Sequence, residues 1–231
     1  METVGSQTDH HYHLERSYPK DLEALALYIN QPGFPTALQR FLFQQRHPNA
    51  QEFPETLPEH SSRIDVFHSA VATFYAPSDL CGAGGMYRER IRSNMKWKGK
   101  PRHDTVFIKV SDDDMIMHGM LIARVLLFFS FHDPILREVI PCALVNWFIP
   151  VSDQRDKAMG TWEVKLEMAG VRPTLEVIHL DSIVRGAHLL PAYGRGFLPE
   201  DFDFRDALEA FRSYFVNNLI DYHAHELLQK N

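Results

Sequence analysis

Two segments near the start of the chain have apolar residues three and four positions apart, which is the spacing of one helix face. They span residues 19–31 and 35–47, with Pro and Gly residues between them. This pattern predicts a helix pair over residues 19–47 with a short turn. Residues 1–18 are polar and predict a tail, and residues 48–62, rich in Pro and Glu, predict a loop.

The middle of the chain has the patterns of strands. Residues 63–76 alternate between apolar and polar positions, as in a strand with one buried face. Residues 121–131 are almost entirely apolar, as in a strand that is covered on both faces. Further strand-like runs lie at 105–110, 137–150, 161–168 and 174–180. Because the connections are short, the β-rich core over 63–180 predicts an antiparallel, partly barrel-like sheet of about five or six strands.

The end of the chain predicts a long helix over residues 201–230. Apolar residues recur there at spacings of four and three, which places them on one stripe of a helix. They are Phe204, Leu208, Phe211, Phe215, Leu219 and Tyr222. We expect this stripe to pack across the sheet, although it could instead face a partner protein. Together the elements predict a single α+β domain over residues 19–231.

The composition is typical of a folded protein from a reducing compartment. Of the 231 residues, 45% are hydrophobic and 23% are charged, which suits a chain with a sizeable core. The only cysteines are Cys81 and Cys142, too few for a disulfide framework, so we expect reduced thiols. The N-terminus lacks an apolar signal segment, and the longest apolar run is too short for a membrane helix. We therefore expect an intracellular protein without a membrane partner.

Positive charge is concentrated in residues 82–103, although the net charge of the chain is −6. From Arg88 to Arg102, seven cations stand against one acid, Glu89. Phosphate groups attract such a cluster, and an exposed aromatic ring among the cations, here Trp97, can stack on a base. The segment thus predicts a nucleic-acid site. The cations expected to bind phosphates are Arg88, Arg90, Arg92, Lys96, Lys98 and Arg102.

Two other interpretations of this segment are open. It could be a solvated loop whose arginines pair with neighbouring acids and bind nothing. The glycines of "GAGG" at 82–85 could also present backbone N–H groups to an anion ahead of a short helix. That string matches neither a P-loop nor a dinucleotide fingerprint, so the charge of the segment is the stronger signal.

No set of residues in the sequence makes a defensible catalytic site. The HExxH, CxxC and GxSxG motifs are absent. An enzyme that needs a divalent metal would have to bring carboxylates together from separate elements. Its candidates would be Asp79, Asp104, Asp112, His179 and Asp181. The sequence favours a non-catalytic protein without a cofactor or metal.

A protein-binding surface could form where an apolar run ends in Trp147 and Phe148. These rings are expected in the core or at the rim of the barrel. If Trp147 is exposed instead, the two rings could line a groove for a protein partner, because Trp often anchors interfaces.

Several long strings resemble one protein family. They are "VFHSAVATFYAPSDLCGAGGMYRERIR", "ARVLLFFSF", "IPCALVNWF", "VIHLDSIVRGAHLLPAYG" and "YFVNNLIDYHAHE". From about His11 to Glu226 the chain resembles the C-terminal region of Plavaka-type (CACTA-like) transposases, which are basidiomycete fungal mobile-element proteins. In that family the nuclease core, an RNase H-like fold with acidic metal ligands, lies upstream and has no matching positions here. The resemblance implies a nuclear, non-catalytic accessory module whose partners are DNA or other element-encoded proteins.

A second resemblance concerns residues 105–190. The order of "ARVLLFF", "CALVNWF" and "VIHLDSIV" is similar to that in a bromo-adjacent homology domain, a β-rich module of chromatin proteins. It implies the alternative function, a protein-interaction or chromatin-recognition module that makes no contact with nucleic acid.

Overall fold

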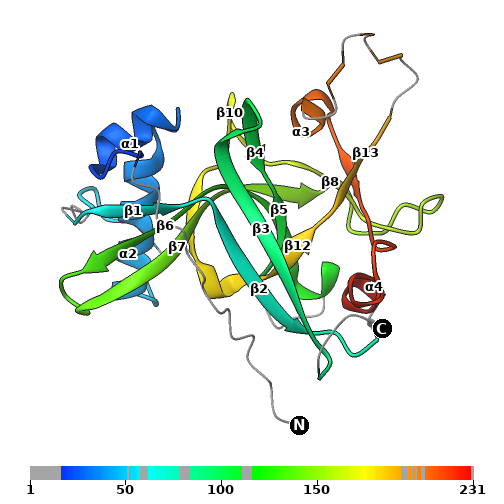
Figure 1. Cartoon of the computed structure of the whole chain (residues 1–231), viewed down its shortest axis with the longest axis horizontal. Helices are drawn as coiled ribbons and strands as arrows, with labels where there is room; N and C mark the ends of the chain where they lie inside the picture. Colours follow the sequence, from blue (N-terminus) through cyan, green and yellow to red (C-terminus); the bar gives the residue numbers. More distant parts are fainter. Residues whose placement is uncertain are drawn as a thin grey trace.

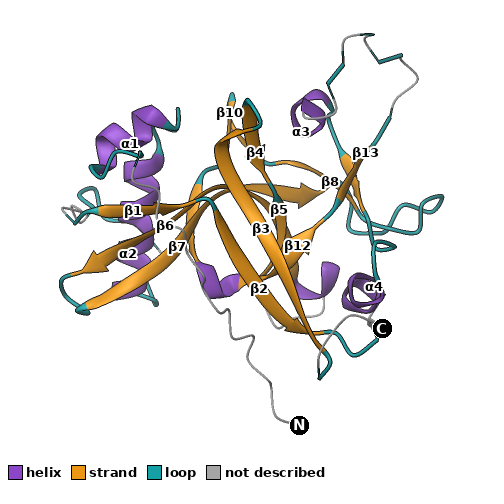
Figure 2. Cartoon of the chain, in the orientation of Figure 1, coloured by secondary structure: helices purple, strands orange, loops and turns teal. Residues whose placement is uncertain are grey.

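The structure is a computed structural model of the chain, and most of it is built from strands. It describes residues 17–50, 52–57, 62–78, 84–110, 116–193, 197–198, 200, 202–203 and 206–229. The α-helices lie near the two ends of the described chain, and the strands between them form a nearly closed antiparallel sheet (Figure 1, Figure 2). The fold is therefore α+β with a barrel-like sheet, as the sequence predicts.

A long hairpin is the centre of the main sheet. Strand β6 (Met120–Asp133) pairs with β7 (Glu138–Pro150) along almost its whole length. The other strands of this nine-stranded sheet are β1 (Ile64–Phe67), β5 (Thr105–Lys109), β8 (Glu163–Leu166), β11 (Glu176–His179), β12 (Ile183–Ala187), β13 (Leu189–Pro191) and β14 (Tyr214–Val216). The order is β12-β5-β6-β7-β8-β14-β13, while β1 pairs with β6 and β11 pairs with β7. More strands thus join the sheet than the sequence predicts.

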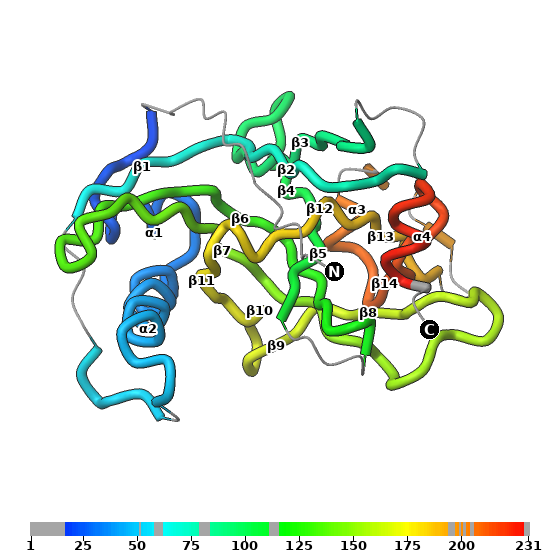
Figure 3. Tube along the Cα trace, turned by 90° about the horizontal axis from the view of Figure 1, so that it is seen from below, coloured from blue at the N-terminus to red at the C-terminus, as the bar shows by residue number. Residues whose placement is uncertain are grey.

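A smaller sheet covers one side of the main sheet. It has the order β2-β3-β4 and consists of β2 (Ser69–Tyr75), β3 (Met86–Trp97) and β4 (Lys100–His103). Figure 3 shows these strands on one side of the molecule and the short pair β9 (Met168–Ala169) and β10 (Arg172–Pro173) on the other. Apolar side chains of β2 and β3, such as Phe74 and Ile91, are buried in one cluster with side chains of β5, β6 and β7. This packing nearly closes the barrel.

The single strand predicted over residues 63–76 is two strands. The break falls at His68, after which the chain leaves β6 and pairs with β3 instead. The predicted alternation holds on both sides of the break. Ile64 and Val66 are buried beneath the helices, whereas Ala70 and the residues that alternate with it are buried in the barrel.

The N-terminal helix pair is confirmed as α1 (Leu22–Tyr28) and α2 (Phe34–Arg46). Asp21 caps α1, because its side chain accepts a hydrogen bond from the Ala24 N–H at 2.9 Å. None of the helices in the described part of the chain has both the length and the apolar character that crossing a membrane requires. Two 3-10 turns, at Met117–Gly119 and Leu180–Ser182, connect strands.

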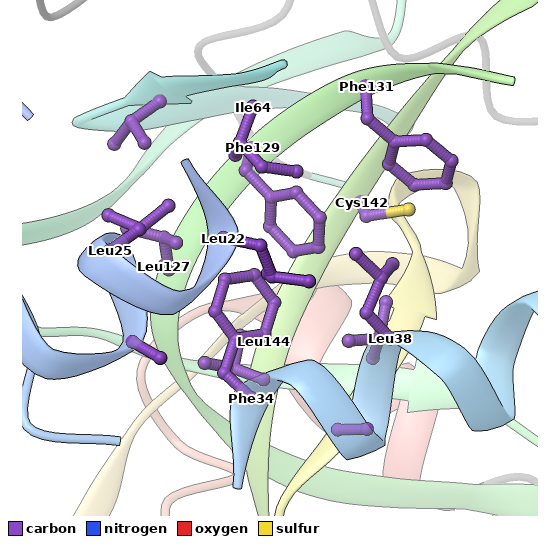
Figure 4. Packing of buried hydrophobic residues seen from close by; sticks show 14 of the residues in the cluster. Leu22, Leu25, Phe34, Leu38, Ile64, Leu127, Phe129, Phe131, Cys142 and Leu144 are labelled. Carbon is purple, nitrogen blue, oxygen red and sulfur yellow. The ribbon is translucent and has the colours of Figure 1, made fainter. Parts of the chain in front are cut away.

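The helix pair packs against one end of the β6–β7 hairpin. Figure 4 shows Phe34 and Leu38 of α2 facing the rings and aliphatic side chains of the two strands. The Phe34 and Phe129 rings meet edge to face, with centroids 5.0 Å apart. Cys142 is a free thiol buried in this cluster, and burial raises its pKa. Cys81 lies outside the described residues.

The polar-tail prediction for residues 1–18 is wrong at its end. Tyr18 is buried in the helical cluster, and the centroid of its ring lies 5.0 Å from the centroid of the Tyr28 ring. Burial of this ring is favourable because an aromatic side chain removes a large apolar area from water. Residues 1–16 lie outside the described part.

The long C-terminal helix predicted over residues 201–230 is also wrong. The described residues of this segment form a short helix α3 (Ala207–Ala210), strand β14 and helix α4 (Tyr222–Gln229). In β14, Tyr214 and Val216 are buried at alternate positions, and the strand lies between β8 and β13. Aromatic and β-branched residues favour strands when such partners are present.

The described residues of the predicted helical stripe therefore do not form one buried face, and Phe204 lies outside the described part. The stripe residues Leu219 and Tyr222 are 80% and 67% exposed, while Phe211 packs against the Tyr214 ring at a centroid distance of 6.5 Å. Apolar spacing alone could not distinguish these environments, because the contacts that bury β14 come from strands far away in the sequence.

The tip of the β6–β7 hairpin depends on one buried carboxylate, and we expect Asp133→Ala to lower the free energy of unfolding by about 2–3 kcal/mol. Asp133 is 2% exposed and accepts hydrogen bonds from the Ile135 N–H at 2.7 Å, the Leu136 N–H and the Arg46 guanidinium. Burial alone would raise its pKa, but these bonds hold the pKa below its ordinary value. Urea unfolding at neutral pH measures the loss.

A matched variant separates the ion pair from the turn. Asp133→Asn keeps an oxygen acceptor for the backbone N–H groups and should lose only about 1 kcal/mol. The pKa of Asp133 is lowered in the folded state, so its carboxylate stabilises the protein at pH values above its ordinary pKa. This stabilisation is lost as the pH falls from the ordinary pKa through the lowered pKa. Wild-type stability in Asp133→Ala would contradict this account of the tip.

Candidate nucleic-acid interface

The basic segment forms a β-hairpin, not a solvated loop. Strand β3 turns at Lys98 and Gly99 into β4, and both turn residues have positive φ angles, 50° and 90°. Gly85 and Gly84 form a turn that leads directly into β3, so no helix follows the described glycines. Residues 79–83, which include the first part of "GAGG", lie outside the described part. The anion site ahead of a helix is therefore not supported.

Strand alternation separates the residues of β3 into two faces. Ile91 is buried in the barrel cluster, and Tyr87 packs against that cluster. The three arginines alternate with these positions and therefore lie on the other face of the strand. Arg88 and Arg90 are exposed, and Arg92 is half-buried. The hairpin thus presents a row of cations on its solvent face.

Four predicted phosphate-binding cations have no carboxylate within ion-pair distance among the described residues. They are Arg88, Arg90, Arg92 and Lys96. Arg90 donates a hydrogen bond to the Ser69 hydroxyl at 3.0 Å, which holds the side chain along the strand surface. Lys98 is exposed at the turn. We call Arg88, Arg90, Arg92 and Lys96 the cationic row.

Two other cations of the segment are bound to the protein's own acids. The Lys100 ammonium lies 2.9 Å from Asp206 and 3.1 Å from Asp203, and hydrogen bonds to these carboxylates raise its pKa. Arg102 Nε donates to Asp104 Oδ1 at 2.8 Å. The prediction that Arg102 binds phosphate is therefore weakened, because a neighbouring carboxylate already takes this position.

Trp97 is in contact with two guanidinium groups. The central carbons of Arg92 and Arg102 each lie 5.6 Å from the centroid of its ring, within the range of cation–π attraction. The side chain is 37% exposed. In the free protein the ring therefore orients Arg92 and Arg102. A base that stacks on Trp97, as predicted, would have to share the ring with these two arginines.

A pocket of about 560 Å³ opens between the hairpin and α3. Trp97 and Arg102 line it from the hairpin, Leu208 and Glu209 line it from α3, and the buried Arg124 of β6 also lines it. In the sequence, Arg124 is the one charged residue of the otherwise almost entirely apolar run 121–131. A charged residue inside a buried strand is itself a signal, because burying a charge requires a partner.

His103 lies beside this pocket as a neutral imidazole. Its Nδ1 is 3.1 Å from the Val125 carbonyl oxygen, and a carbonyl can only accept, so Nδ1 carries the proton. Burial, reinforced by the Arg124 charge, lowers the pKa of His103 to about 4, although the Val125 bond and Asp104 oppose the shift. At neutral pH, His103 adds no positive charge to the pocket.

The described metal-site candidates include one adjacent pair but no cluster of three. Asp104 is bound by Arg102, and His179 contacts Asp181 at 3.4 Å. Asp79 and Asp112 lie outside the described part of the chain. Within that part, no group of three metal-binding side chains occurs.

The predicted interaction surface at Trp147 and Phe148 is wrong. Trp147 is 8% exposed and donates its indole N–H to Glu176 at 2.5 Å, while Phe148 is completely buried. Both residues lie in β7, a central strand that is covered on both faces, so their rings are core residues. This agrees with the expectation that they belong to the core.

Comparisons with protein-family models, with curated proteins and with solved structures found no match to this chain. The transposase and bromo-adjacent homology resemblances accordingly stay predictions.

Proposed function

We propose that the protein binds nucleic acid through the outer face of β3, as a non-catalytic accessory module. The observation that carries the proposal is the cationic row, whose members share the solvent side of one strand without carboxylate partners among the described residues. Same-face residues of a strand are roughly 7 Å apart, so its three arginines span about 14 Å. A row of this length can contact several phosphates along one backbone.

A two-stranded hairpin has a suitable shape for this role. β-ribbons can enter the major groove of DNA, and arginine is the residue that most often contacts guanine there. Trp97 holds Arg92 and Arg102 beside one another, and guanidinium planes can themselves stack on unpaired bases. The transposase resemblance supports DNA as the partner and the nucleus as the compartment.

We expect the combined change of Arg88, Arg90 and Arg92 to Ala to weaken DNA binding at least about tenfold at physiological salt. If each arginine neutralises one phosphate, the steepness of the slope of log affinity against log salt concentration should also fall, by about 2.7 for double-stranded DNA and about 2.1 for single strands. Gel-shift titrations at two salt concentrations, with single- and double-stranded DNA, measure both effects.

The matched control removes three exposed cations that lie outside the basic hairpin. Changing Lys157, Lys165 and Arg172 to Ala gives the same net charge, and all three residues are exposed. β10, which carries Arg172, lies on the opposite side from β3 (Figure 3). This control should keep most of the affinity. Equal binding by the two triple variants would reject the cationic row as the site.

A protein partner is the second candidate function. Leu219, Ile220 and Tyr222 are exposed together beside a shallow pocket of about 390 Å³. Exposed apolar groups of this kind occur at protein interfaces. Failure of the wild-type protein to bind DNA at low salt would favour this candidate.

A further inference from the structure

Arg124 is a buried cation whose partners come from a neighbouring surface element. It lies in β6 between Thr105 of β5 and Asn146 of β7, and it is 5% exposed. Its guanidinium donates to the Glu209 carboxylate and to the Leu208 carbonyl of α3. Its Nε is also buried and has no hydrogen-bond partner among the described residues. The contacts with α3 therefore leave this cation incompletely satisfied.

The element that supplies these partners is weakly packed. Helix α3 has four residues, and none of them is buried. The Glu209 side chain is 65% exposed, against 6% for Arg124. A carboxylate at the surface loses little when it returns to water, whereas a buried arginine needs an anion in its place. The two partners of this ion pair thus depend on each other unequally.

The pocket in front of Arg124 borders the basic hairpin, and its lining residue Trp97 contacts Arg92 of the cationic row. Trp97 and Arg102 of the hairpin line the pocket, and its volume of about 560 Å³ is within the usual range for ligand sites. The nearby acids Asp206 and Asp104 are bound to Lys100 and Arg102, and His103 is neutral where it lines the pocket. Glu209 is the carboxylate that neutralises Arg124 itself.

We propose that Arg124 is an anion-binding position, which Glu209 fills in the free protein and a phosphate group fills in the bound protein. The proposal rests on the nucleic-acid function inferred above. A phosphodiester and a carboxylate each carry one negative charge, so the exchange preserves the charge balance around Arg124. The planar guanidinium fork suits phosphate as well as carboxylate.

Glu209 then acts as an internal competitor for the ligand. A phosphate can reach Arg124 only in the fraction of molecules in which Glu209 has withdrawn, and this fraction reduces the apparent affinity. Neutralising the carboxylate removes the competition without removing the cation. We therefore expect Glu209→Gln to bind phosphate about tenfold more tightly than the wild type.

The test uses inorganic phosphate as the first probe and a short single-stranded oligonucleotide as the second. The full chain is titrated with each probe, and binding is followed by the NMR signal of the Trp97 indole, which lines the pocket. Glu138→Gln is the control, because it removes one negative charge from an exposed position at the tip of the β6–β7 hairpin. This control should bind phosphate within about twofold of the wild type.

Three outcomes would overturn the proposal. The first is an equal phosphate affinity in the wild type and Glu209→Gln, and the second is an equal gain in Glu138→Gln. The third is an absence of saturable phosphate binding in Glu209→Gln. Adding Arg124→Lys to Glu209→Gln should abolish the gain, since Lys lacks the guanidinium fork.

The two probes separate this inference from the function on which it rests. If phosphate binding follows Glu209 but no oligonucleotide binds, the anion position stands and the nucleic-acid function is wrong. If the oligonucleotide binds through the cationic row and Glu209→Gln changes neither titration, the function stands and the anion position is wrong.

Discussion

Replacing Asp221 with Ala is expected to lower the free energy of unfolding by about 3–5 kcal/mol. The change removes the carboxylate that is hydrogen-bonded to the buried guanidinium of Arg185. Arg185 is 3% exposed and donates to the two carboxylate oxygens of Asp221 at 2.8 and 2.5 Å. Asp221 also caps helix α4, where it accepts the Ala224 N–H at 2.7 Å. Urea unfolding at neutral pH, with the wild type as reference, measures the loss.

The effect is large because Arg185 joins several separate elements. Its guanidinium carbon lies 4.8 Å from the centroid of the Phe74 ring in β2, and Glu89 of β3 approaches it at 3.9 Å. Burial would raise the pKa of Asp221, but the hydrogen bonds from Arg185 and Ala224 hold it below the ordinary value. The pair therefore stays ionised at neutral pH, and it connects α4 to both sheets.

Two further variants make this prediction specific. Asp153→Ala removes an exposed carboxylate and should change the stability by less than about 0.5 kcal/mol. Arg185→Met combined with Asp221→Ala should be more stable than Asp221→Ala alone, because no buried charge is left unpaired. If the double variant is less stable than the single one, the unpaired charge of Arg185 is not the cause of the loss.

The second large effect is a loss of stability in mild acid that depends on His103. Its pKa is lowered to about 4 in the folded protein, below the ordinary value of 6.5. Between these values the unfolded chain binds a proton that the folded chain does not bind, so stability falls as the pH falls from 6.5 towards 4. The shift corresponds to about 3 kcal/mol.

His103→Asn is the matched variant for this effect. Asn can still donate a hydrogen bond to the Val125 carbonyl, but it has no group that titrates in this range. We expect the wild type to lose about 3 kcal/mol more than His103→Asn between pH 7 and pH 4, as measured by urea unfolding at each pH. Parallel pH profiles for the two proteins would show that burial beside Arg124 does not control this histidine.

The basic hairpin illustrates what a local sequence pattern can predict and what it cannot. The arginines of "RERIR" alternate with Glu89 and Ile91, and that period of two is a strand signal in the sequence itself. The high charge of the segment obscured it, because exposed charged residues are typical of loops. The location of the positive charge was predicted, but the strand that orders it into a row was recognised only in the structure.

The pairing of these charges lay beyond any local pattern. Lys100 is 106 residues from Asp206, and Arg124 is 85 residues from Glu209. Lys100 and Arg124 are neutralised only because α3 and the residue before it bring Asp206 and Glu209 next to them. Their availability is therefore a property of the tertiary structure, and so is the pocket between the hairpin and α3.

The sequence by itself determined the N-terminal helix pair, the β-rich core and the position of the basic segment, because each leaves a periodic or compositional trace among neighbouring residues. Only the tertiary structure decided that the chain breaks at His68, that Tyr214 and Val216 form a strand, and which cations keep their charge exposed. These outcomes depend on contacts between residues far apart in the chain, and such contacts stabilise one local conformation over another without changing the local pattern.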